Sequence, residues 1–577
     1  MKEIKLIIIL VSLIFYLGVS AKNVFAADFY ISPTGNDSNN GQTSSTPVAT
    51  FAHAETLLNA GDTLILMDGI YNQQLHPRKS GTEGNPITYM AQNRGQAIIQ
   101  MTTPGEAILL ASNSSGYPGG AFYCHDITID GLIARSNGEY NTIVINSWDS
   151  ATEAEMVKRI IIRNIGAFGS ALDANAAAVA IGNNATYITI EDSFAYGIGR
   201  AAMIAFGSSH ITVRRVVLRY DYWRGTGKIN DPRRAFSGYN TQDSVFENII
   251  VLDGAPMPPE VSCDMAGMVA SGNLTPAYVT HSARNKYLGS IVLNTVGNGL
   301  LTNGGGSPNE DQQFKDLIFH KVTGYGAVVE QLETRGIYEY ITIKNSGALG
   351  FKTGTNGVSD ETIKNFFIDT TGGVGFYLEN PSAVTTFVDN TAINLVSGSP
   401  IEASYAPTLD YLTRPTMVTG HERGGTMVNR YVDGNLTSIP LWPWPNEDLI
   451  RENMCDPDDL ITAHRTSANG AGWEPEWCAS NKTLTEHIWE YLGNECPEEI
   501  CGAISIRSDV DNSSVTNTTD ALLTLRNSLG LSMDGTAWQA GATTGDVNCD
   551  EVSNSTDALL ILRYSLGLSM DGTSWCE

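Results

Sequence analysis

Between about Asp28 and Tyr431 the chain consists of short β-branched runs in which apolar and polar residues alternate. Each run is followed by a turn and a second short strand, and the pattern returns every 20 to 35 residues, as in RIIIRNIGAFG from Arg159 and EYITIKNSGALG from Glu339. Alternation predicts strands with one buried face. Self-similarity at this irregular period predicts rungs that stack on their neighbours and share one core. The sequence therefore predicts an all-β fold, a parallel β-helix over residues 27–431.

The beginning of this region supports the same fold independently. It reads FYISPTGNDSNNG, then PVATFAHAETLLNAG with a helical pattern, then DTLILMDGIY. These segments resemble the opening of many secreted right-handed parallel β-helix proteins. The resemblance implies that the helix caps the first rung and covers its open strand edge. Polysaccharide lyases, glycoside hydrolases, epimerases and non-catalytic surface proteins all share this fold, so the fold alone does not indicate the chemistry.

The N-terminus predicts export from the cytoplasm. Lys2 and Lys5 precede an apolar run that ends near Val19, and Val24-Phe25-Ala26 provides a small-residue cleavage site. This is the pattern of a signal peptide over residues 1–26. The run is too short and wrongly flanked for a membrane span, and no other stretch approaches that length. We therefore expect a secreted protein, extracellular or at the cell surface, with no membrane span.

A stretch of twenty residues near the C-terminus occurs twice, from Thr519 and again from Thr556, with three differences. Its leucines recur at nearly helical spacing and predict one helix in each copy, ending near a glycine such as Gly530. A carboxylate-rich loop precedes each helix, with oxygen side chains at positions 1, 3, 5 and 12. A hard cation such as calcium is bound with this spacing. The predicted ligands are Asp509, Asp511, Ser513 and Asp520 in the first loop, and Asp546, Asn548, Asp550 and Asp557 in the second.

Two loop-and-helix units in tandem over residues 506–577 resemble a type I dockerin, the module that attaches extracellular enzymes to cohesin-bearing scaffolds. The resemblance implies calcium in both loops and a cohesin partner that contacts loop positions 10 and 11. Those positions are Thr518, Thr519, Ser555 and Thr556. The glycine that dockerins carry at position 6 is replaced by Ser514 and Glu551. Two plainer interpretations stay open: the hydroxyls as helix N-caps, and the tail as a helical hairpin with solvated acidic turns.

Residues 432–505 break the rung pattern and predict a small linker or capping module. Pro443 and Pro445 exclude a central strand, and Thr483 with Glu486 predicts a capping box at the start of a helix. Six of the eight cysteines lie from Cys455 onward, and an even number in an exported chain favours disulfides over a zinc site. The sequence does not indicate their pairing. The tryptophans of this module could stack on sugars, but packing is the preferred interpretation.

Charge is unevenly distributed along the chain. The net charge is −27, and residues from Glu447 to Glu577 include 23 acidic and 6 basic side chains, which argues against nucleic acid as a ligand. Seven of the 35 basic residues nevertheless lie between Arg214 and Arg234. Outward residues of stacked rungs are about 4.8 Å apart, so one face of a β-helix suits an extended polymer. Guanidinium groups bind carboxylate or sulfate, and the cluster therefore predicts an anionic polysaccharide as the ligand.

A polymer of uronic acids can be cleaved by β-elimination, in which a base removes the C5 proton while a cation neutralises the neighbouring carboxylate. An ammonium among guanidiniums has a lowered pKa, so Lys228 is the first candidate for the base. Asp221 and Asp231 would orient the cations or hold a further calcium ion. The predicted catalytic set is Lys228, Arg219, Arg224, Tyr222 and His210. The predicted substrate-binding set is Arg214, Trp223, Arg233, Arg234 and Tyr239.

Three other interpretations stay open. A glycoside hydrolase would need two carboxylates on adjacent rungs, for which Asp221, Asp253 and Asp264 are candidates. The arginines could be surface ion pairs of little energetic value. The β-helix could also be a non-catalytic rod or carbohydrate-binding spacer. The chain has no GxSxG motif, no P-loop and no dinucleotide fingerprint, which argues against serine-hydrolase and nucleotide chemistry.

Overall fold

The structure is a computed structural model in which the chain forms two compact units. The first unit contains the region up to residue 417 and the short segment Tyr431–Asn435, and the second contains residues 436–457 and 474–577. The structure describes residues 26–112, 122–138, 140–147, 155–169, 176–197, 201–221, 233–254, 265–271, 282–303, 308–395, 401–403, 429–455, 474–480, 482–493, 496–501, 508, 510–511, 516–533, 536, 538, 545–548, 552–566, 568, 570 and 573–575.

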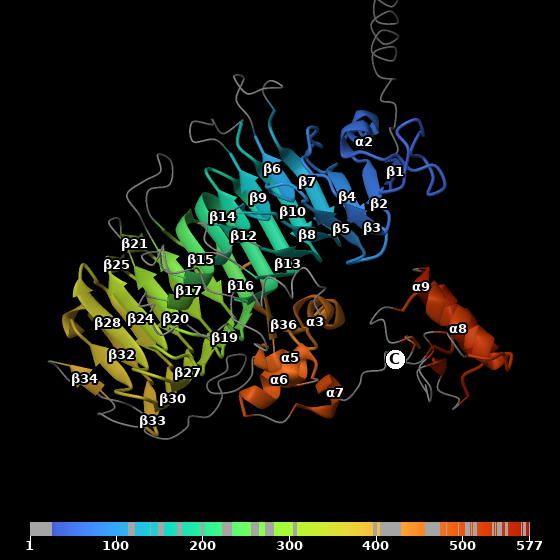
Figure 1. Ribbon diagram of the computed structural model, residues 1–577. Helices are drawn as coiled ribbons and strands as arrows, with labels where there is room; N and C mark the ends of the chain where they lie inside the picture. The colour runs from blue at the N-terminus through green and yellow to red at the C-terminus, as the bar shows by residue number, and fades with distance from the viewer. Residues whose placement is uncertain are drawn as a thin grey trace, which may run out of the picture. The chain divides into compact units, whose positions relative to one another are not determined.

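Three parallel sheets, named A, B and C, make up the first unit, and each rung passes through them in that order (Figure 1). Sheet A contains β1 (Asp28–Ile31), β2 (Thr63–Leu66), β4 (Ile87–Ala91), β7 (His125–Asp130), β10 (Lys158–Arg163), the first part of β13 (Thr186–Tyr196), the middle of β14 (Ala201–Arg219), the first part of β16 (Val245–Leu252), β18 (Lys286–Leu288), β22 (Gln313–Lys315), β26 (Ile337–Glu339), β29 (Glu361–Lys364) and β32 (Val384–Val388). Sheet B contains β3 (Gly69–Tyr71), β5 (Ala97–Gln100), β8 (Ile133–Arg135), β11 (Gly166–Phe168), the last parts of β13, β14 and β16, β19 (Ile291–Leu293), β23 (Ile318–His320), β27 (Thr342–Ser346), β30 (Phe367–Thr371) and β33 (Thr391–Ile393). Sheet C contains β6 (Ile108–Ala111), β9 (Ile143–Asn146), β12 (Ala177–Gly182), the first part of β14, β15 (Arg233–Gln242), β17 (Met265–Ser271), β20 (Asn298–Asn303), β24 (Ala327–Gln331), β28 (Phe351–Asn356), β31 (Phe376–Leu378) and β34 (Ile401–Ala403).

Every pairing within the three sheets is parallel and joins a strand to its counterpart one rung away. Gln313 of β22, for example, lies between Lys286 of β18 and Ile337 of β26. A short additional pair, β21 (Asn309–Glu310) with β25 (Glu333–Thr334), lies between sheets C and A, and a 3-10 turn, η1 (Pro381–Ala383), precedes β32. The predicted fold, a parallel β-helix, is confirmed.

The capping helix is also where the sequence places it. Helix α2 (Phe51–Leu57) begins after Thr50, whose hydroxyl accepts a hydrogen bond from the His53 N–H. Phe51 is buried with Phe29 of the first strand in the same apolar cluster, and its ring lies 5.7 Å from that of Tyr71. Helix α2 therefore closes the N-terminal end of the core.

The core is a continuous stack of inward side chains along the axis. In sheet A one row runs in register through successive rungs: Tyr89, Ile129, Ile162, Ile190, Val213, Phe246, Tyr287, Phe314, Tyr338 and Ile363. Ring centroids are 5.0 Å apart for Phe246 and Tyr287, 4.9 Å for Tyr287 and Phe314, and 4.8 Å for Phe314 and Tyr338. These distances match the spacing of strands in a sheet, so each ring stacks on the ring one rung away.

Two corners of the β-helix turn through residues in the left-handed region. The corner between sheets A and B places Asn164, Asp192, Arg215, Asn248, Asp316, Tyr340, Asn365 and Asp389 at φ between 50° and 58° in successive rungs. The corner before sheet A has φ between 51° and 61° at Asp126, Arg159, Tyr187, His210, Asp243, Arg284, Asp311, Arg335 and Asp360. Asn and Asp tolerate this conformation well, whereas Arg, Tyr and His adopt it less often. The turn is thus imposed by the stacking of rungs rather than by residue preference.

Strands β35 (Asn429–Val432) and β36 (Asn435–Pro440) pair with each other, and the second unit contains the helices α3 (Glu447–Cys455), α5 (Glu476–Ala479), α6 (Leu484–Tyr491) and α7 (Glu498–Cys501). The predicted capping box of Thr483 and Glu486 is present at α6. Disulfides join Cys455 to Cys478 and Cys496 to Cys501. Trp442, Trp444, Trp477 and Trp489 are buried, so these side chains pack rather than offer faces to sugars.

The duplicated tail forms helices α8 (Thr518–Ser528) and α9 (Ser555–Ser565), which share a small apolar core of Ala521, Val547, Leu560 and Ile561. Among the described residues, no helix is both long and apolar enough to cross a membrane. The predicted signal peptide lies almost entirely outside the described residues, which begin at Ala26.

Candidate functional site

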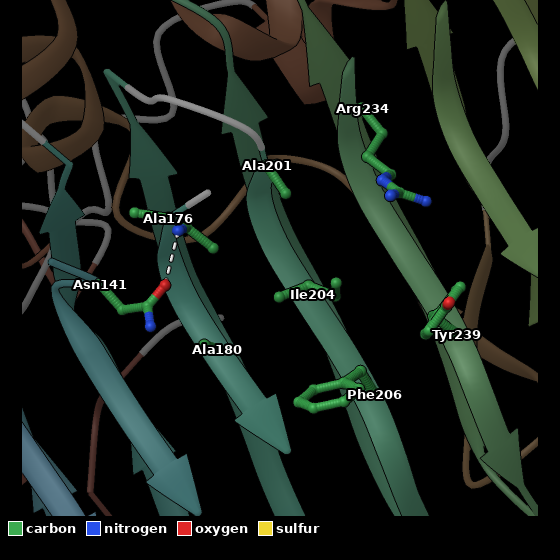
Figure 2. Close-up of a pocket in the computed structure, with 9 residues that line it drawn as sticks. Asn141, Ala176, Ala180, Ala201, Ile204, Phe206, Arg234 and Tyr239 are labelled. Carbon is green, nitrogen blue, oxygen red and sulfur yellow. Dashed lines mark hydrogen bonds between the residues drawn. The ribbon is translucent and has the colours of Figure 1, made fainter. Parts of the chain in front are cut away.

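An open hollow of about 200 Å³ lies on the outer face of sheet C, over four successive rungs. Figure 2 shows Asn141 at one edge, Ile204 and Phe206 of β14 in the middle, and Arg234 and Tyr239 of β15 at the opposite edge. The lining residues are Asn141, Ala176, Ala177, Ala180, Ala201, Ile204, Phe206, Arg234 and Tyr239. The hollow therefore combines an apolar floor with one cation and two aromatic rings.

Strand register explains how these side chains come together. Ala177 of β12 pairs with Ala201 of β14, which pairs with Arg234 of β15. Phe206 pairs with Tyr239 in the same way, and their ring centroids are 6.4 Å apart. Small residues on two rungs leave the space, and larger residues on the next rungs form its wall. Outward neighbours on adjacent rungs lie about 4.8 Å apart, so the hollow follows the axis of the β-helix.

Arg234 is the only cationic side chain that lines this hollow among the described residues. The residue is 2% exposed, its Nη1 donates to Ser237 Oγ at 3.4 Å, and its guanidinium carbon lies 6.0 Å from the centroid of the Tyr239 ring. A guanidinium held at the edge of an apolar hollow is suited to a carboxylate or sulfate, which it can bind through two parallel hydrogen bonds. Arg234, almost fully buried, and Tyr239, half-buried, thus both line the hollow, and their substrate-binding role stays a prediction.

Four of the predicted residues lie in the segment just before β15. Tyr222, Trp223, Arg224 and Lys228 are outside the described residues, which end at Asp221 and resume at Arg233. Arg233 opens β15, where its backbone pairs with that of Met265. The cationic segment therefore directly precedes, in sequence, the strand that contributes Arg234 and Tyr239 to the hollow.

Arg219 has a different environment from the one its predicted catalytic role requires. Its side chain and that of Asp221 are both fully buried, with Arg219 Nε 2.6 Å from Asp221 Oδ1. The guanidinium carbon also lies 5.9 Å from the centroid of the Tyr196 ring. A buried ion pair in this arrangement fixes the end of β14. We therefore assign Arg219 to the support of the strand and not to contact with a polymer.

Arg214 belongs to a ladder of alternating charges on the outer face of sheet A. Its Nε lies 2.7 Å from Glu191 Oε2, and its Nη1 lies 3.0 Å from Asp433 Oδ1. The register continues this row as Asp130, Arg163, Glu191, Arg214 and Glu247. Arg214 lies on a different sheet from the hollow, and the ion-pair interpretation fits it better than substrate binding.

The same row is covered by the segment Tyr431–Asn435, which we name the strap. The backbone N–H groups of Asp433 and Gly434 donate to the two Glu247 oxygens at 3.0 and 2.9 Å, and the Tyr431 N–H donates to Asn248 Oδ1 at 2.8 Å. Burial raises the pKa of Glu247, although these two N–H groups oppose the shift. The strap lies on the first unit, so the predicted boundary between 431 and 432 falls within a continuous contact with the β-helix.

His210 occupies the corner before sheet A, where other rungs carry ion pairs. Its ring stacks on that of Tyr187 with centroids 4.7 Å apart. At equivalent corners Arg159 Nη2 lies 2.7 Å from Asp126 Oδ2 and Arg284 Nε lies 2.7 Å from Asp243 Oδ1. The histidine and tyrosine replace one such pair. This position gives His210 a structural contact and separates it from the hollow, which belongs to sheet C.

A glycoside hydrolase would need two carboxylates close together, and the candidates from the sequence were Asp221, Asp253 and Asp264. Asp221 is buried against Arg219, and Asp253 is buried at a corner where Asn294 Nδ2 donates to its Oδ1 at 2.9 Å. Asp264 lies outside the described residues. The structure therefore does not bring Asp221 and Asp253 together on an open surface.

The two tail loops have the same hydrogen-bond geometry. Asp520 Oδ1 accepts from the Val510 and Asp511 N–H groups at 2.9 and 3.3 Å, and its Oδ2 accepts from the Asn517 N–H at 2.7 Å. Asp557 repeats this pattern with Val547, Asn548 and Asn554 at 3.0, 3.2 and 2.8 Å. Position 12 of each loop is therefore tied to the beginning of the same loop, near Asp511 and Asp546.

The remaining predicted ligands, Asp509, Ser513 and Asp550, lie outside the described residues. Within the part of the chain that the structure describes, no group of three or more His, Cys, Asp or Glu side chains is arranged to hold a metal ion. Carboxylate and amide oxygens at Asp511, Asp520, Asp546, Asn548 and Asp557 are of the type that calcium prefers. Calcium in these loops stays a prediction.

The N-caps of the tail helices are Asn517 and Asn554, not the hydroxyl residues that follow them. The interpretation of the hydroxyls as N-caps is therefore wrong, and Thr518, Thr519, Ser555 and Thr556 are all exposed. Leucines at matching positions of the two helices are also exposed, with Leu522 at 63% and Leu559 at 66%. Hydroxyls and leucines are therefore accessible at matching positions of the two helices.

The sequence interpretation missed the floor of the hollow. A signal was present in three aligned segments, AAVAIG from Ala177, AAMIAF from Ala201 and RAFSGY from Arg234, which occupy the same sheet on successive rungs. Alignment of these segments places Phe206 beside Tyr239. Asn141 has no comparable signal, because its contribution depends on the hydrogen bond that its Oδ1 accepts from the Ala177 N–H at 2.7 Å.

No protein-family model matches the chain. Pectate lyase L of Dickeya chrysanthemi is 27% identical over 168 residues, which are 28% of this chain and 38% of that protein. Among solved structures, pectate lyase Pel9A aligns over 67% of this chain and 80% of its own, with a TM-score of 0.34 and 15% identity. The A-module of the Azotobacter vinelandii mannuronan C-5 epimerase AlgE6 aligns over 60% and 92%, with a TM-score of 0.38 and 12% identity. The chain thus spans less than two fifths of the length of the curated relative.

Proposed function

We propose that this chain is an extracellular polysaccharide lyase that binds a uronic acid polymer on the outer face of sheet C and cleaves it by β-elimination. The observation that carries the proposal is the hollow with Arg234 and Tyr239 at its edge, directly after the cationic segment 222–232. The partial sequence similarity to pectate lyase L supports the same class of substrate.

The hollow can recognise such a polymer through three kinds of contact. The flat apolar face of a sugar ring fits the alanine floor and the rings of Phe206 and Tyr239. The carboxylate of the sugar is bound by Arg234, whose charge compensates that of the substrate. Because the hollow extends over four rungs, neighbouring sugars continue along the sheet. The arrangement favours a long chain over a single sugar.

β-Elimination in this site requires a base and a neutralised carboxylate. The base takes the C5 proton, the electron pair forms a C4–C5 double bond, and the C4–O bond to the next sugar breaks, after which the released oxygen takes a proton. We propose Lys228 as the base, with Tyr222 as the alternative, and Arg224 and Arg234 as the neutralising cations. A calcium ion held by Asp231 would supply the same neutralisation.

The proposal is tested by incubation of the purified protein with polygalacturonate, alginate and other uronate polymers. Elimination produces an unsaturated sugar end, so ultraviolet absorbance should rise together with the number of reducing ends. New reducing ends without absorbance would mean that the protein is a glycoside hydrolase. Binding without either signal would leave the non-catalytic rod as the correct interpretation.

We further propose that the tail is a dockerin-like module that binds calcium and a cohesin-bearing scaffold. The duplicated loop geometry around Asp520 and Asp557 supports two equivalent ion sites. The accessible hydroxyls and exposed leucines on α8 and α9 support a docking surface. Secretion follows from the predicted signal peptide and accords with the two disulfides.

Calcium titration of the full chain by calorimetry should reveal two exchangeable sites in the tail. Asp520→Asn should remove one site and Asp557→Asn the other, because an amide lacks the charge that a position-12 carboxylate supplies. Thr524→Ser, within α8 and away from both loops, serves as the control and should keep both sites. Equal heats for all four proteins would contradict calcium binding by these loops.

A further inference from the structure

Two glutamates are buried inside the β-helix, far from any described role. Glu333 lies in β25 and Glu361 at the beginning of β29, and neither residue has any exposed surface. A carboxylate in such a place costs several kcal/mol unless it is paired or coordinated. In the part of the chain that the structure describes, no lysine, arginine or histidine forms an ion pair with either side chain. The negative charge therefore has no counter-charge from the described residues.

Other oxygen atoms are buried beside the pair. Asn309 pairs with Glu333 across the short sheet, and Asn309 and Thr302 both act on the Glu333 carboxyl and lower its pKa. Gln312 lies one rung before Gly336, which lies one rung before Glu361. Gln312 is fully buried, and its Oε1 has no hydrogen-bond partner among the described residues. Glu361 Oε2 is also buried and has no hydrogen-bond partner among the described residues.

Gly336 leaves the room in which these oxygens meet. A Cβ atom on this residue would lie 2.3 Å from Glu361 Oε2, so the carboxylate occupies the place of a side chain. The Gly336 N–H donates to Glu361 Oε1 at 3.4 Å. A larger residue between Gln312 and Glu361 would separate them. Gln312, Gly336 and Glu361 thus occupy the same register position on three successive rungs, and the middle one has no side chain.

We propose that this cluster is a structural calcium site enclosed in the β-helix, with Glu333 and Glu361 as the charged ligands and Asn309, Gln312 and Thr302 as neutral oxygen ligands. Two carboxylates balance one divalent ion. All five donors are oxygens, the donor type that calcium prefers over nitrogen or sulfur. The ion would tie together four rungs, from β20 to β29. No part of this proposal rests on the polysaccharide lyase activity.

Protons compete with the ion for the two carboxylates. Without an ion, burial raises the pKa of Glu333 to about 8 and that of Glu361 to about 9, the latter with a contribution from the charge of Glu333 and a smaller one from Asp360. Tyr287 and Tyr338 also face the pair, and burial raises the pKa of both phenols. Calcium must displace these protons, so its affinity should rise with pH.

The raised pKa values of the two glutamates also make the stability of the metal-free protein depend on pH. Burial raises both folded-state pKa values above the ordinary glutamate value of 4.5, so the metal-free protein should lose stability as the pH rises above that value. Bound calcium should remove most of this loss. A pair of glutamates that simply stays protonated would show the same loss of stability with and without calcium.

The experiment uses the full chain with the tail loops disabled by Asp520→Asn and Asp557→Asn. Metal analysis after gel filtration at pH 8 should find a tightly held calcium ion in each chain. Glu333→Gln with Glu361→Gln in the same background should lower the content by one ion per chain, since the amides keep the shape of the side chains and remove their charge. An unchanged metal content in this variant, or a parent without calcium, would overturn the proposal.

A second measurement does not depend on the folding of that variant. The tail-disabled protein is melted between pH 6 and pH 9 with calcium and with a chelator, and the two melting temperatures should separate increasingly as the pH rises. Terbium in place of calcium should give luminescence sensitised by Tyr338, with at most one bound water by lifetimes in H₂O and D₂O. Identical melting curves at every pH would show that the pair holds protons instead of an ion.

Discussion

Arg234→Gln is expected to reduce the rate of eliminative cleavage by at least about a hundredfold, which is the usual effect of removing one group that stabilises developing charge. The guanidinium lies at the edge of the hollow beside Tyr239, where it would neutralise the uronate carboxylate. Glutamine keeps much of the volume and removes the charge. The measurement is the initial rise of ultraviolet absorbance on the best polymer of the panel, with circular dichroism to verify the fold.

The matched control is Arg214→Gln, which makes the same substitution on a different sheet. Arg214 is held by Glu191 and Asp433 and should contribute at most about 1 kcal/mol to stability as a surface ion pair. Its variant should keep activity within about twofold. If Arg234→Gln kept more than half of the activity, or if both variants lost it equally, the hollow would not be the catalytic site.

Phe314→Ala is expected to lower the free energy of unfolding of the β-helix by about 3–5 kcal/mol, the usual cost of deleting a fully buried aromatic ring. Phe314 lies between Tyr287 and Tyr338, so the truncation would leave a cavity within the stack and remove two ring contacts at once. Urea denaturation followed by tyrosine fluorescence and far-ultraviolet circular dichroism measures the change.

Two controls accompany this variant. Phe314→Leu fills most of the volume and should cost roughly 1 kcal/mol. Tyr187→Ala, at an exposed corner, should cost less than about 1 kcal/mol because it removes a solvated ring contact with His210. A Phe314→Ala variant as stable as Phe314→Leu would mean that neighbouring rings close the space, and the stack would then be less rigid than its geometry indicates.

The fold could be predicted from the sequence because each rung carries its own signal. Alternation in runs such as HITVRRVVLRY places Ile211 and Val213 in the core, where both are fully buried. The corner residues could not be predicted, since nothing local marks His210 or Arg215 for the left-handed region. Stacking on the neighbouring rungs imposes that conformation and moves His210 away from the candidate site.

The site was predictable only in part, for a related reason. A cluster of basic residues is visible in a sequence, but the sheet on which each one lies depends on rung register. Arg214, Arg219 and Arg234 look equivalent in the sequence, whereas they lie in a surface ladder, a buried ion pair and the wall of the hollow. The buried Glu333 and Glu361 carry even less signal, because an isolated glutamate near a turn is typical of a surface position.

The strap also decides where a mechanical load would enter the molecule. Its backbone is fixed to Glu247 and Asn248, in the middle of the β-helix, although the preceding rungs continue to β34. If the tail is anchored to a scaffold while the polymer pulls on sheet C, tension along the chain reaches β16 before it reaches the last rungs. The last strands would then not be pulled out of the sheets one after another. The force would instead act on the rung of β16, to which the strap is hydrogen-bonded.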